Sequence, residues 1–469
     1  MPIRSEKERD ILIMVDMKAK PFYLSEEDCK WVEETIAGMT TEEKIGQLFF
    51  NMGSSRDEEY LKMTVDKYHI GGIRYNPATG AEVREQNRIL QENSKIPLII
   101  ACNTENGGNG ACTDGTMIGQ QTKIGATRDA RYAYELGRMS NKEAAAIGCN
   151  LSFAPVSDIL YNWENPVIGL RTYGNDVDRV CEMTKAYMDG AHTNEGFCCA
   201  AKHFPGDGLD FRDQHVADSV NDMSCEEWDA SYGKVYQNLI DNGLEAIMAG
   251  HIMQPAYTRH FNPGIKDEDI MPATLSPELI EGLLRGKLGF NGMVLTDASH
   301  MVGLTCCMKR SEMLPHTIAA GVDMFLFFNE MDEDFASMMA GYENGIITEE
   351  RLNDALHRIL ALKAHMGLHK KAKNEIIPPV EVMEQVVGCE EHKAMAREIS
   401  EKGITLVKYK DEDVLPMIPS RYKRIMIVSV SGLSAGVMGT MMAKYMGGGK
   451  KSPAERLRDK LIEKGFDAF

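Results

Sequence analysis

The sequence predicts an α/β protein, a TIM-type (β/α)8 barrel followed by a short, incomplete α/β sandwich domain. From Trp31 to about Leu368, short apolar runs alternate with longer amphipathic stretches, as in repeated β-α units. About eight such units in roughly 340 residues suit a barrel with insertions. Several of the apolar runs also end in polar, reactive residues, where barrel enzymes keep their chemistry. A doubly wound open sheet is the alternative, because periodicity alone does not determine whether a sheet closes.

The candidate strands share short apolar runs bounded by Gly, Pro or polar residues. In chain order they are Ile70–Tyr75, Pro97–Cys102, Leu151–Pro155, Cys198–Phe204, Ala246–His251, Gly292–Asp297 and Val322–Phe327. The segments between them include stretches with helical spacing of apolar residues, namely Arg131–Ile147, Asp176–Thr193, Pro277–Arg285 and Glu349–His365. This alternation predicts a parallel sheet covered by helices.

The composition changes after Leu368, and the change predicts the domain organisation. We expect the catalytic barrel in residues 1–370 and a solvated linker in residues 371–389, which are rich in Lys and Pro. Residues 390–469 are then a partial α/β domain, too small to bury a large core of its own. Its expected elements are a helix over Glu390–Lys402, strands at Ile404–Lys408 and Arg424–Val430, and a helix after Pro453.

Charge and cysteine usage limit the classes of partner. The 469 residues include 70 acidic and 52 basic side chains, a net charge of −18 that opposes binding to nucleic acid or to anionic lipid. The N-terminal apolar run Ile11–Val15 is shorter than a signal-peptide core, and the 11 cysteines show no C-x-x-C spacing. We therefore expect a cytoplasmic protein with no metal, no cofactor and no membrane or nucleic-acid partner. The sequence does not determine an oligomeric state.

The first chemically informative segment runs from Lys202 to His215 and breaks from a strand into a loop rich in Pro and Gly. Asp213 and His215 are two residues apart, so the carboxylate could hold one imidazole nitrogen while the other faces a substrate. A histidine held in this way can give a proton to a leaving group and later take one from water. An unpartnered Asp-x-His pair on the surface is the alternative, because short combinations of this kind are common.

The second informative segment is the apolar strand that ends at Thr296-Asp297. A carboxylate held at a strand end in a cleft can attack an anomeric carbon and stabilise an oxocarbenium-like transition state. Asp is also a favoured helix N-cap, and that structural role stays open for Asp297 on this segment alone.

Together these segments resemble glycoside hydrolase family 3, and specifically its β-N-acetylglucosaminidase branch. The run Lys202-His203-Phe204-Pro205-Gly206, followed by Asp213-x-His215, is similar to that branch's signature loop, in which an Asp/His pair replaces a glutamate acid/base. Gly289-Phe290-x-Gly292 before Asp297 is similar to the family's nucleophile strand. Further matches in order are Asn150-x-x-Phe153-Ala154-Pro155-Val156-x-Asp158, Arg171-x-x-Gly174-x-Asp176, Met248-x-x-His251 and Pro272-Ala273-Thr274-Leu275-Ser276.

The resemblance implies a role for each candidate residue. Asp297 would be the nucleophile, and Asp213 with His215 the acid/base pair. The residues implied to bind the sugar are Arg171, Lys202, His203, Asn103 and His251. Without the resemblance, a structural salt bridge for Arg171 and a buried polar pair for Lys202-His203 are the simpler interpretations. The family usually has an aspartate where this chain has Asn103, and this departure bears on the sugar preference.

The resulting hypothesis is a retaining, exo-acting β-N-acetylhexosaminidase that releases terminal N-acetylglucosamine through a covalent glycosyl-enzyme. Three alternatives stay open. One is a family 3 β-glucosidase or β-xylosidase with its acid/base elsewhere. Another is an N-acetylglucosaminide phosphorylase, because a neutral histidine base does not repel phosphate as a carboxylate would. The last is a catalytically silent sugar-binding barrel, suggested by the changed Asn103 motif.

Overall fold

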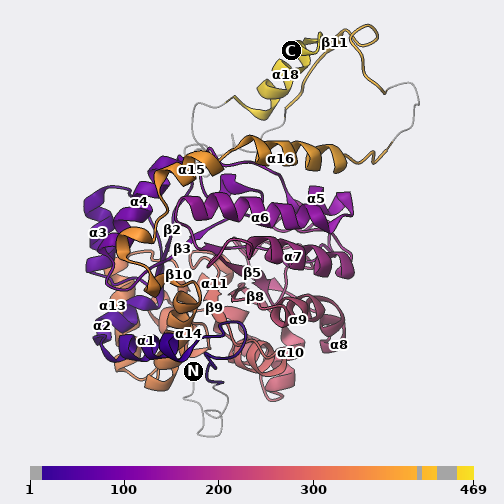
Figure 1. The fold of residues 1–469 in the computed structure, drawn as a ribbon. Coiled ribbons are helices and arrows are strands. Elements are labelled where there is room, and N and C mark those ends of the chain that lie inside the picture. The colour runs from indigo at the N-terminus through magenta and orange to yellow at the C-terminus, as the bar shows by residue number, and fades with distance from the viewer. Residues whose placement is uncertain (1–12, 409–414, 430–450) are drawn as a thin grey trace. The chain divides into compact units, whose positions relative to one another are not determined.

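The computed structural model describes residues 13–408, 415–429 and 451–469. The chain forms two units, Met1–Ile404 and Thr405–Phe469, and each is described by itself. The first unit is built on an eight-stranded parallel sheet in the order β10-β1-β2-β3-β4-β5-β7-β9 (Figure 1). Its strands are β1 (Phe49–Met52), β2 (Gly72–Arg74), β3 (Ile99–Cys102), β4 (Leu151–Ser152), β5 (Cys198–Phe204), β7 (Ala246–Ala249), β9 (Met293–Thr296) and β10 (Phe325–Leu326).

The two ends of this strand order meet and close the sheet into a barrel. β10 pairs with β1, and on its other side a parallel bridge joins Leu295 of β9 to Met324, the residue before β10. The amide of Thr296 also donates to the carbonyl of Met324 at 3.1 Å. The predicted TIM-type barrel is therefore confirmed, and the open doubly wound sheet is wrong.

Helices surround the strands, and several begin where the sequence supplies a cap. Ser25, Thr40 and Thr79 each form a capping box at the first turn of a helix. Figure 1 shows α6 and α7 side by side, and these two helices are in contact along their length. The main helices of the first unit are α1 (Glu26–Ala37), α2 (Thr41–Gln47), α3 (Glu58–Asp66), α4 (Gly80–Asn93), α5 (Gln121–Thr127), α6 (Ala130–Ala146), α7 (Val177–Ala191), α9 (Lys234–Asp241), α10 (Pro255–Phe261), α11 (Val302–Thr305), α12 (Arg310–Ala319), α13 (Met331–Glu343), α14 (Glu349–His365), α15 (Val380–Val386) and α16 (Glu390–Lys402).

Most predicted elements lie where the patterns placed them. β5 and α14 begin and end at the predicted residues, whereas the predicted helix Pro277–Arg285 is a π-helix over Glu278–Lys287. Among the eight strands of the barrel, β1 is the one that the sequence patterns missed. Its apolar residues follow α2 with no Gly or Pro between the helix and the strand, so no break signal separates the two elements.

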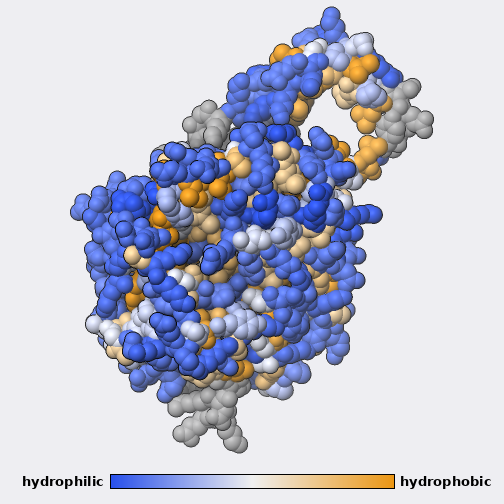
Figure 2. Space-filling view, in the orientation of Figure 1, coloured by the Kyte–Doolittle hydropathy of each residue, from blue (hydrophilic) through white to orange (hydrophobic). Residues whose placement is uncertain are grey.

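Buried apolar side chains fill the barrel and the layer between strands and helices. Cys198 and Cys199, the first two residues of β5, belong to different apolar clusters, because successive side chains of a strand point to opposite faces. Figure 2 shows a face on which hydrophilic residues predominate and apolar residues form small scattered groups. None of the helices described in the structure has the length and apolar character needed to cross a bilayer.

The second unit contains a short parallel pair, β11 (Arg424–Ile425) with β12 (Asp467–Ala468), and helix α18 (Pro453–Glu463). The strand predicted at residues 404–408 is wrong, since these residues form no strand. The rest of the predicted partial domain includes residues 409–414 and 430–450, which lie outside the described residues, as do residues 1–12 of the N-terminal segment. The predicted linker at 371–389 and domain at 390–469 stay predictions.

Candidate active site

Polar side chains gather at the carboxyl ends of the barrel strands. Asn103 follows β3, Lys202 and His203 lie near the end of β5, His251 is the second residue after β7, and Asp297 follows β9. Because all these strands are parallel, their carboxyl ends lie at the same end of the barrel. The fold therefore brings together residues that are almost 200 positions apart in the sequence.

Asp297 is mostly buried, with a side chain 16% exposed. Its Oδ1 accepts a hydrogen bond from the amide of Ala298 at 2.7 Å, and its Oδ2 lies 3.9 Å from Nε2 of His203. Burial raises the pKa of the Asp297 carboxyl, but the His203 and His251 rings and the Ala298 amide outweigh burial, and the net pKa is lowered. The structure thus keeps Asp297 ionised, the state in which a carboxylate is nucleophilic.

His203 is held on both sides by charged residues. Its Nδ1 lies 2.7 Å from Oδ2 of Asp158, and because a carboxylate only accepts, Nδ1 carries the proton. Nε2 lies 3.4 Å from Nη2 of Arg171, and a guanidinium only donates. Asp158 is fully buried and also accepts from the backbone amides of His203 and Asp207. Asp158 therefore fixes both the tautomer and the orientation of the His203 ring.

Glu105 pairs with two cations at this end of the barrel. Arg171 donates to Glu105 through Nε and Nη2, each at 3.0 Å, and Lys202 Nζ forms an ion pair with Oε1 of the same carboxylate. Burial alone would raise the pKa of Glu105, but Arg171 and Lys202 hold it well below its usual range. Arg171 and Lys202 are therefore two donors held in place by one carboxylate at the carboxyl end of the barrel.

The predicted pairing of Asp213 with His215 is present in the loop that follows β5. Nδ1 of His215 lies 2.7 Å from Oδ1 of Asp213, and the same oxygen accepts from the backbone amide of His215 at 2.8 Å. The His215 side chain is 52% exposed. Within the described part of the chain no group hydrogen-bonds to Nε2 of His215, so this nitrogen is available to a substrate.

The loop that carries Asp213 and His215 is anchored to the barrel by Gln214. The Gln214 side chain is fully buried, donating to Asp207 at 3.1 Å and accepting from the backbone amide of His251 at 2.9 Å. Two backbone amides at the start of α11 donate to the carbonyls of Gln214 and His215. A short parallel pair, β6 (Ser219–Val220) with β8 (Ile252–Met253), ties the end of the loop to the chain after β7. These contacts attach the exposed histidine to the segment after β9.

The two remaining predicted site residues differ in how much of their surface is available. Asn103 is half-buried at the end of β3. His251 is fully buried, and its Nε2 lies 3.0 Å from the carbonyl oxygen of Ala298, while its Nδ1 lies 3.0 Å from Oγ1 of Thr274. Protein groups thus occupy both nitrogens of His251, so its contacts suit a residue that positions the Asp297–Ala298 turn.

Sequence reasoning left four residues out of the predicted site. Asp158 is part of a motif that the sequence analysis quotes, but no local signal links it to His203, 45 residues away, or links Glu105 to Arg171, 66 residues away. Gln214 gave no local signal. His300 follows Asp297 by three residues, and the charges of Asp297 and His215 both act on its pKa, which burial lowers. His300 therefore lies within electrostatic range of both predicted catalytic groups.

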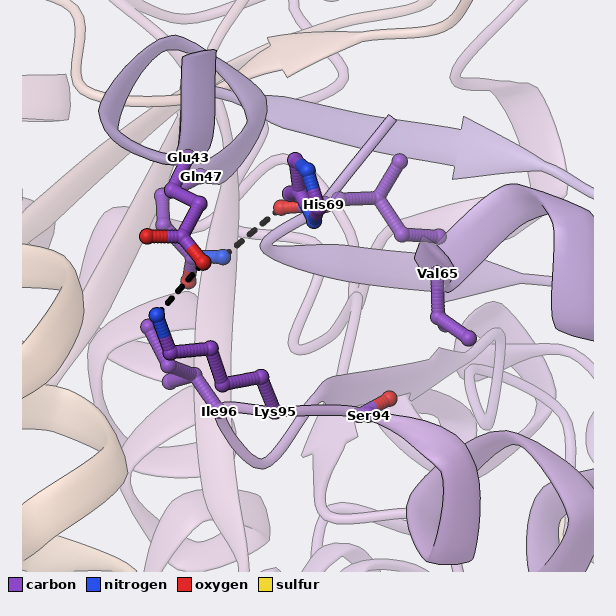
Figure 3. A pocket seen from close by; sticks show the side chains of 8 residues that line it. Glu43, Gln47, Val65, His69, Ser94, Lys95 and Ile96 are labelled. Atoms are coloured by element: carbon purple, nitrogen blue, oxygen red, sulfur yellow. Dashed lines mark hydrogen bonds and ion pairs between the residues drawn. The ribbon is translucent and has the colours of Figure 1, made fainter. Parts of the chain in front are cut away.

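A small pocket elsewhere in the barrel is lined in part by polar groups that bond to one another. It is lined by Glu43, Gln47, Val65, His69, Ile70, Ser94, Lys95 and Ile96. Figure 3 shows the Lys95–Glu43 ion pair and the hydrogen bond from the Gln47 amide to the His69 carbonyl, so these polar groups satisfy one another. The segments that line it precede β2 and β3, at the end of the barrel opposite Asp297.

An ionised carboxylate at a strand end, an Asp/His pair on the loop after β5 and hydrogen-bond donors at the carboxyl end of a (β/α)8 barrel are the kinds of group that a glycosidase site uses. The chain belongs to glycosyl hydrolase family 3. The model of that family's N-terminal domain matches residues 40–362, which include all the site residues described above.

Three known proteins illustrate the likeness. A "Beta-N-acetylglucosaminidase/beta-glucosidase" of Cellulomonas fimi is 40% identical over 97% of this chain and 78% of its own length. The solved structure of "Beta-glucoside phosphorylase BglX" has a TM-score of 0.89 at 40% identity, covering 97% of this chain and 78% of the other. A family 3 β-N-acetylglucosaminidase structure from Paenibacillus sp. str. FPU-7 has a TM-score of 0.77 at 27% identity, covering 92% and 79%.

Proposed function

We propose that the protein is a retaining, exo-acting β-N-acetylhexosaminidase that releases terminal N-acetylglucosamine. The observation that carries this proposal is the 2.7 Å contact between Asp213 and His215 on a loop anchored to the barrel. The Asp/His acid/base is the feature by which the sequence resembles the N-acetylglucosaminidase branch. The N-acetylglucosaminidases among the similar proteins support the same specificity.

In the first step, Oδ2 of Asp297 attacks the anomeric carbon as the glycosidic C–O bond breaks. His215 gives the proton on Nε2 to the departing oxygen, and Asp213 stabilises the imidazolium before this transfer. The products are a sugar ester on Asp297 and the free leaving group. In the second step, neutral His215 takes a proton from water, whose oxygen attacks the anomeric carbon and releases Asp297.

The donors around Glu105 bind the sugar during both steps. Lys202 and Arg171 each have N–H groups beyond those used on Glu105, and these can donate to sugar hydroxyls. His203, kept in place by Asp158, lies between Arg171 and Asp297 and can contact the same ring. Asn103 offers both a donor and an acceptor where family members usually have an aspartate, and His251 supports the turn that holds Asp297.

Phosphorolysis of a β-glucoside or an N-acetylglucosaminide is a second candidate. The similar structure of a β-glucoside phosphorylase favours it, as does the neutral histidine base. Here a phosphate oxygen attacks the anomeric carbon of the glycosyl-enzyme, the ester bond to Asp297 breaks, and any proton on the attacking oxygen passes to His215. The products are a sugar 1-phosphate and the free enzyme.

The test is turnover of nitrophenyl N-acetyl-β-D-glucosaminide and nitrophenyl β-D-glucoside, each with and without inorganic phosphate. We compare wild type, Asp297→Ala and His215→Ala, with His260→Ala as the matched control because His260 is exposed on α10. Loss of a nucleophile or an acid/base lowers the rate by about 10²–10⁴-fold, so both site variants should fall by this factor and azide should restore part of the activity.

The outcomes separate the candidates. Faster turnover of the N-acetylglucosaminide in both conditions, with free sugar as product, supports the hydrolase. A sugar 1-phosphate formed only with phosphate supports phosphorolysis, and preference for the glucoside removes the N-acetylhexosaminidase specificity. Sugar binding without turnover, unchanged in Asp297→Ala, identifies a silent sugar-binding barrel.

A further inference from the structure

Three side chains of metal-binding type meet at the end of the barrel opposite Asp297, and a fourth, His192, contacts one of them. Cys198 is the first residue of β5, Glu245 precedes β7, His365 is the last residue of α14, and His192 follows α7 as its C-cap. The Cys198 Sγ, a Glu245 carboxylate oxygen and a His365 ring nitrogen lie within 4.8 Å of one another. Nε2 of His192 lies 2.8 Å from Oε1 of Glu245, and Nε2 of His365 lies 3.9 Å from the same oxygen.

The ring nitrogens of both histidines face Glu245. Nε2 of His192 is buried, and the Glu245 carboxylate at 2.8 Å is the group that it contacts among the described residues. Nδ1 of His365 lies 2.9 Å from the carbonyl oxygen of Phe22 and must donate to it. In the neutral ring this leaves a lone pair on Nε2, and a backbone carbonyl on the other nitrogen is a common support for a metal-binding histidine.

Glu245 is oriented by its other oxygen. Oε2 accepts from the backbone amide of Cys199 at 3.1 Å, so Oε1 is the oxygen turned toward the two histidines. The Glu245 side chain is 4% exposed, whereas His192 and His365 are each 29% exposed. An ion could therefore enter from the side of the histidines, and the carboxylate would be shielded from water once the ion is bound.

We propose that Cys198, Glu245, His365 and His192 form a site for a divalent transition-metal ion of the zinc class. One thiolate, one carboxylate and two imidazoles are a donor set that suits tetrahedral Zn²⁺. Bonds of about 2.0–2.3 Å to such an ion place neighbouring ligand atoms roughly 3.3–3.8 Å apart. The ligand atoms of Cys198, Glu245 and His365 lie within 4.8 Å of one another, so side-chain shifts of about 1 Å bring these three onto an ion, and rotation of His192 adds the fourth ligand.

The position of the site indicates a structural role. The ligands come from the ends of α7 and α14 and from the starts of β5 and β7, so a bound ion would link two helices to two strands. The amino-terminal end of a (β/α)8 barrel serves stability, while its chemistry is at the carboxyl end. We therefore expect the ion to stabilise the folded barrel and to leave turnover at Asp297 unchanged.

The experiment uses the full chain after treatment with a chelator. Calorimetric titration with Zn²⁺ measures stoichiometry and affinity, and titration with Co²⁺ gives the near-ultraviolet charge-transfer band of a cobalt–thiolate bond. The variants are Cys198→Ala and His365→Gln. Cys199→Ala is the matched control, since this buried neighbour points to the opposite face of β5.

We expect one equivalent of Zn²⁺ to bind wild type and Cys199→Ala, with a higher melting temperature for each. Cys198→Ala should lose the cobalt–thiolate band, and both site variants should bind Zn²⁺ at least tenfold more weakly. If Cys198→Ala does not fold, His365→Gln, at a partly exposed position, gives the answer. Absence of saturable binding in wild type would overturn the proposal, as would a band and affinity that persist in Cys198→Ala, since surface thiols such as Cys306 would then be the ligands.

Discussion

Replacement of Lys363 by Met is expected to stabilise the barrel most strongly at low pH. Lys363 lies on α14, is fully buried, and donates to Oε1 of Gln47 at 2.7 Å. Within the described residues no carboxylate pairs with its ammonium. Burial lowers the pKa of Lys363 from 10.5 to about 7, because the low-dielectric interior disfavours the charged form. The amide of Gln47, seen in Figure 3, also donates to the carbonyl of His69, so Lys363 belongs to a buried polar network.

The sign of the pH dependence follows from the two protonation states. Between pH 7 and pH 10.5 the unfolded chain keeps the proton on Lys363 and the folded chain has lost it, so the wild-type free energy of unfolding rises with pH. At 1.36 kcal/mol per pKa unit, the buried lysine costs about 4–5 kcal/mol at pH 6 and about 2 kcal/mol at pH 9. Loss of the donor to Gln47 costs roughly 1 kcal/mol at either pH.

Lys363→Met should therefore raise the free energy of unfolding by about 3–4 kcal/mol at pH 6 and about 1 kcal/mol at pH 9. Urea unfolding followed by tryptophan fluorescence measures this, since all three tryptophans lie in residues 13–404. Lys371→Met, at an exposed lysine, is the control and should change stability by less than about 0.5 kcal/mol. An equal effect of Lys363→Met at the two pH values would refute the reasoning, because Lys363 would then titrate as it does in water.

Two further substitutions test the contacts of the active site. Glu105→Gln leaves Arg171 and Lys202 without their carboxylate and should lower the free energy of unfolding by about 3 kcal/mol. Urea unfolding measures this change. A decrease of less than about 1 kcal/mol would mean that water already screens the two cations. Gln214→Ala removes two buried hydrogen bonds and should cost roughly 2–3 kcal/mol, while turnover falls because the His215 loop loses its anchor. Full turnover in Gln214→Ala, with the stability loss present, would show that other contacts position His215.

The strands of the barrel were predictable because each is a local pattern. An apolar run bounded by turn residues identifies β5 without any knowledge of which strands lie beside it. Similarly, Asp213-x-His215 contains both partners of one hydrogen bond within three residues. β1 was not predicted, because no Gly or Pro separates it from the preceding helix α2 and the two elements therefore look continuous in the sequence. The domain boundaries predicted after Leu368 rest on composition alone.

The sequence by itself determined the period of the β-α units, the polar residues at the strand ends and the Asp213–His215 pair. Only the tertiary structure decided that the sheet closes, that Glu105 neutralises Arg171 66 residues away, and that Asp158 orients His203 across 45 residues. The same holds for Cys198 and His365, which no local motif connects. The physical reason is that hydrophobic periodicity and turn chemistry act between near neighbours, whereas ion pairs and ligand clusters depend on which strand ends the closed barrel brings together.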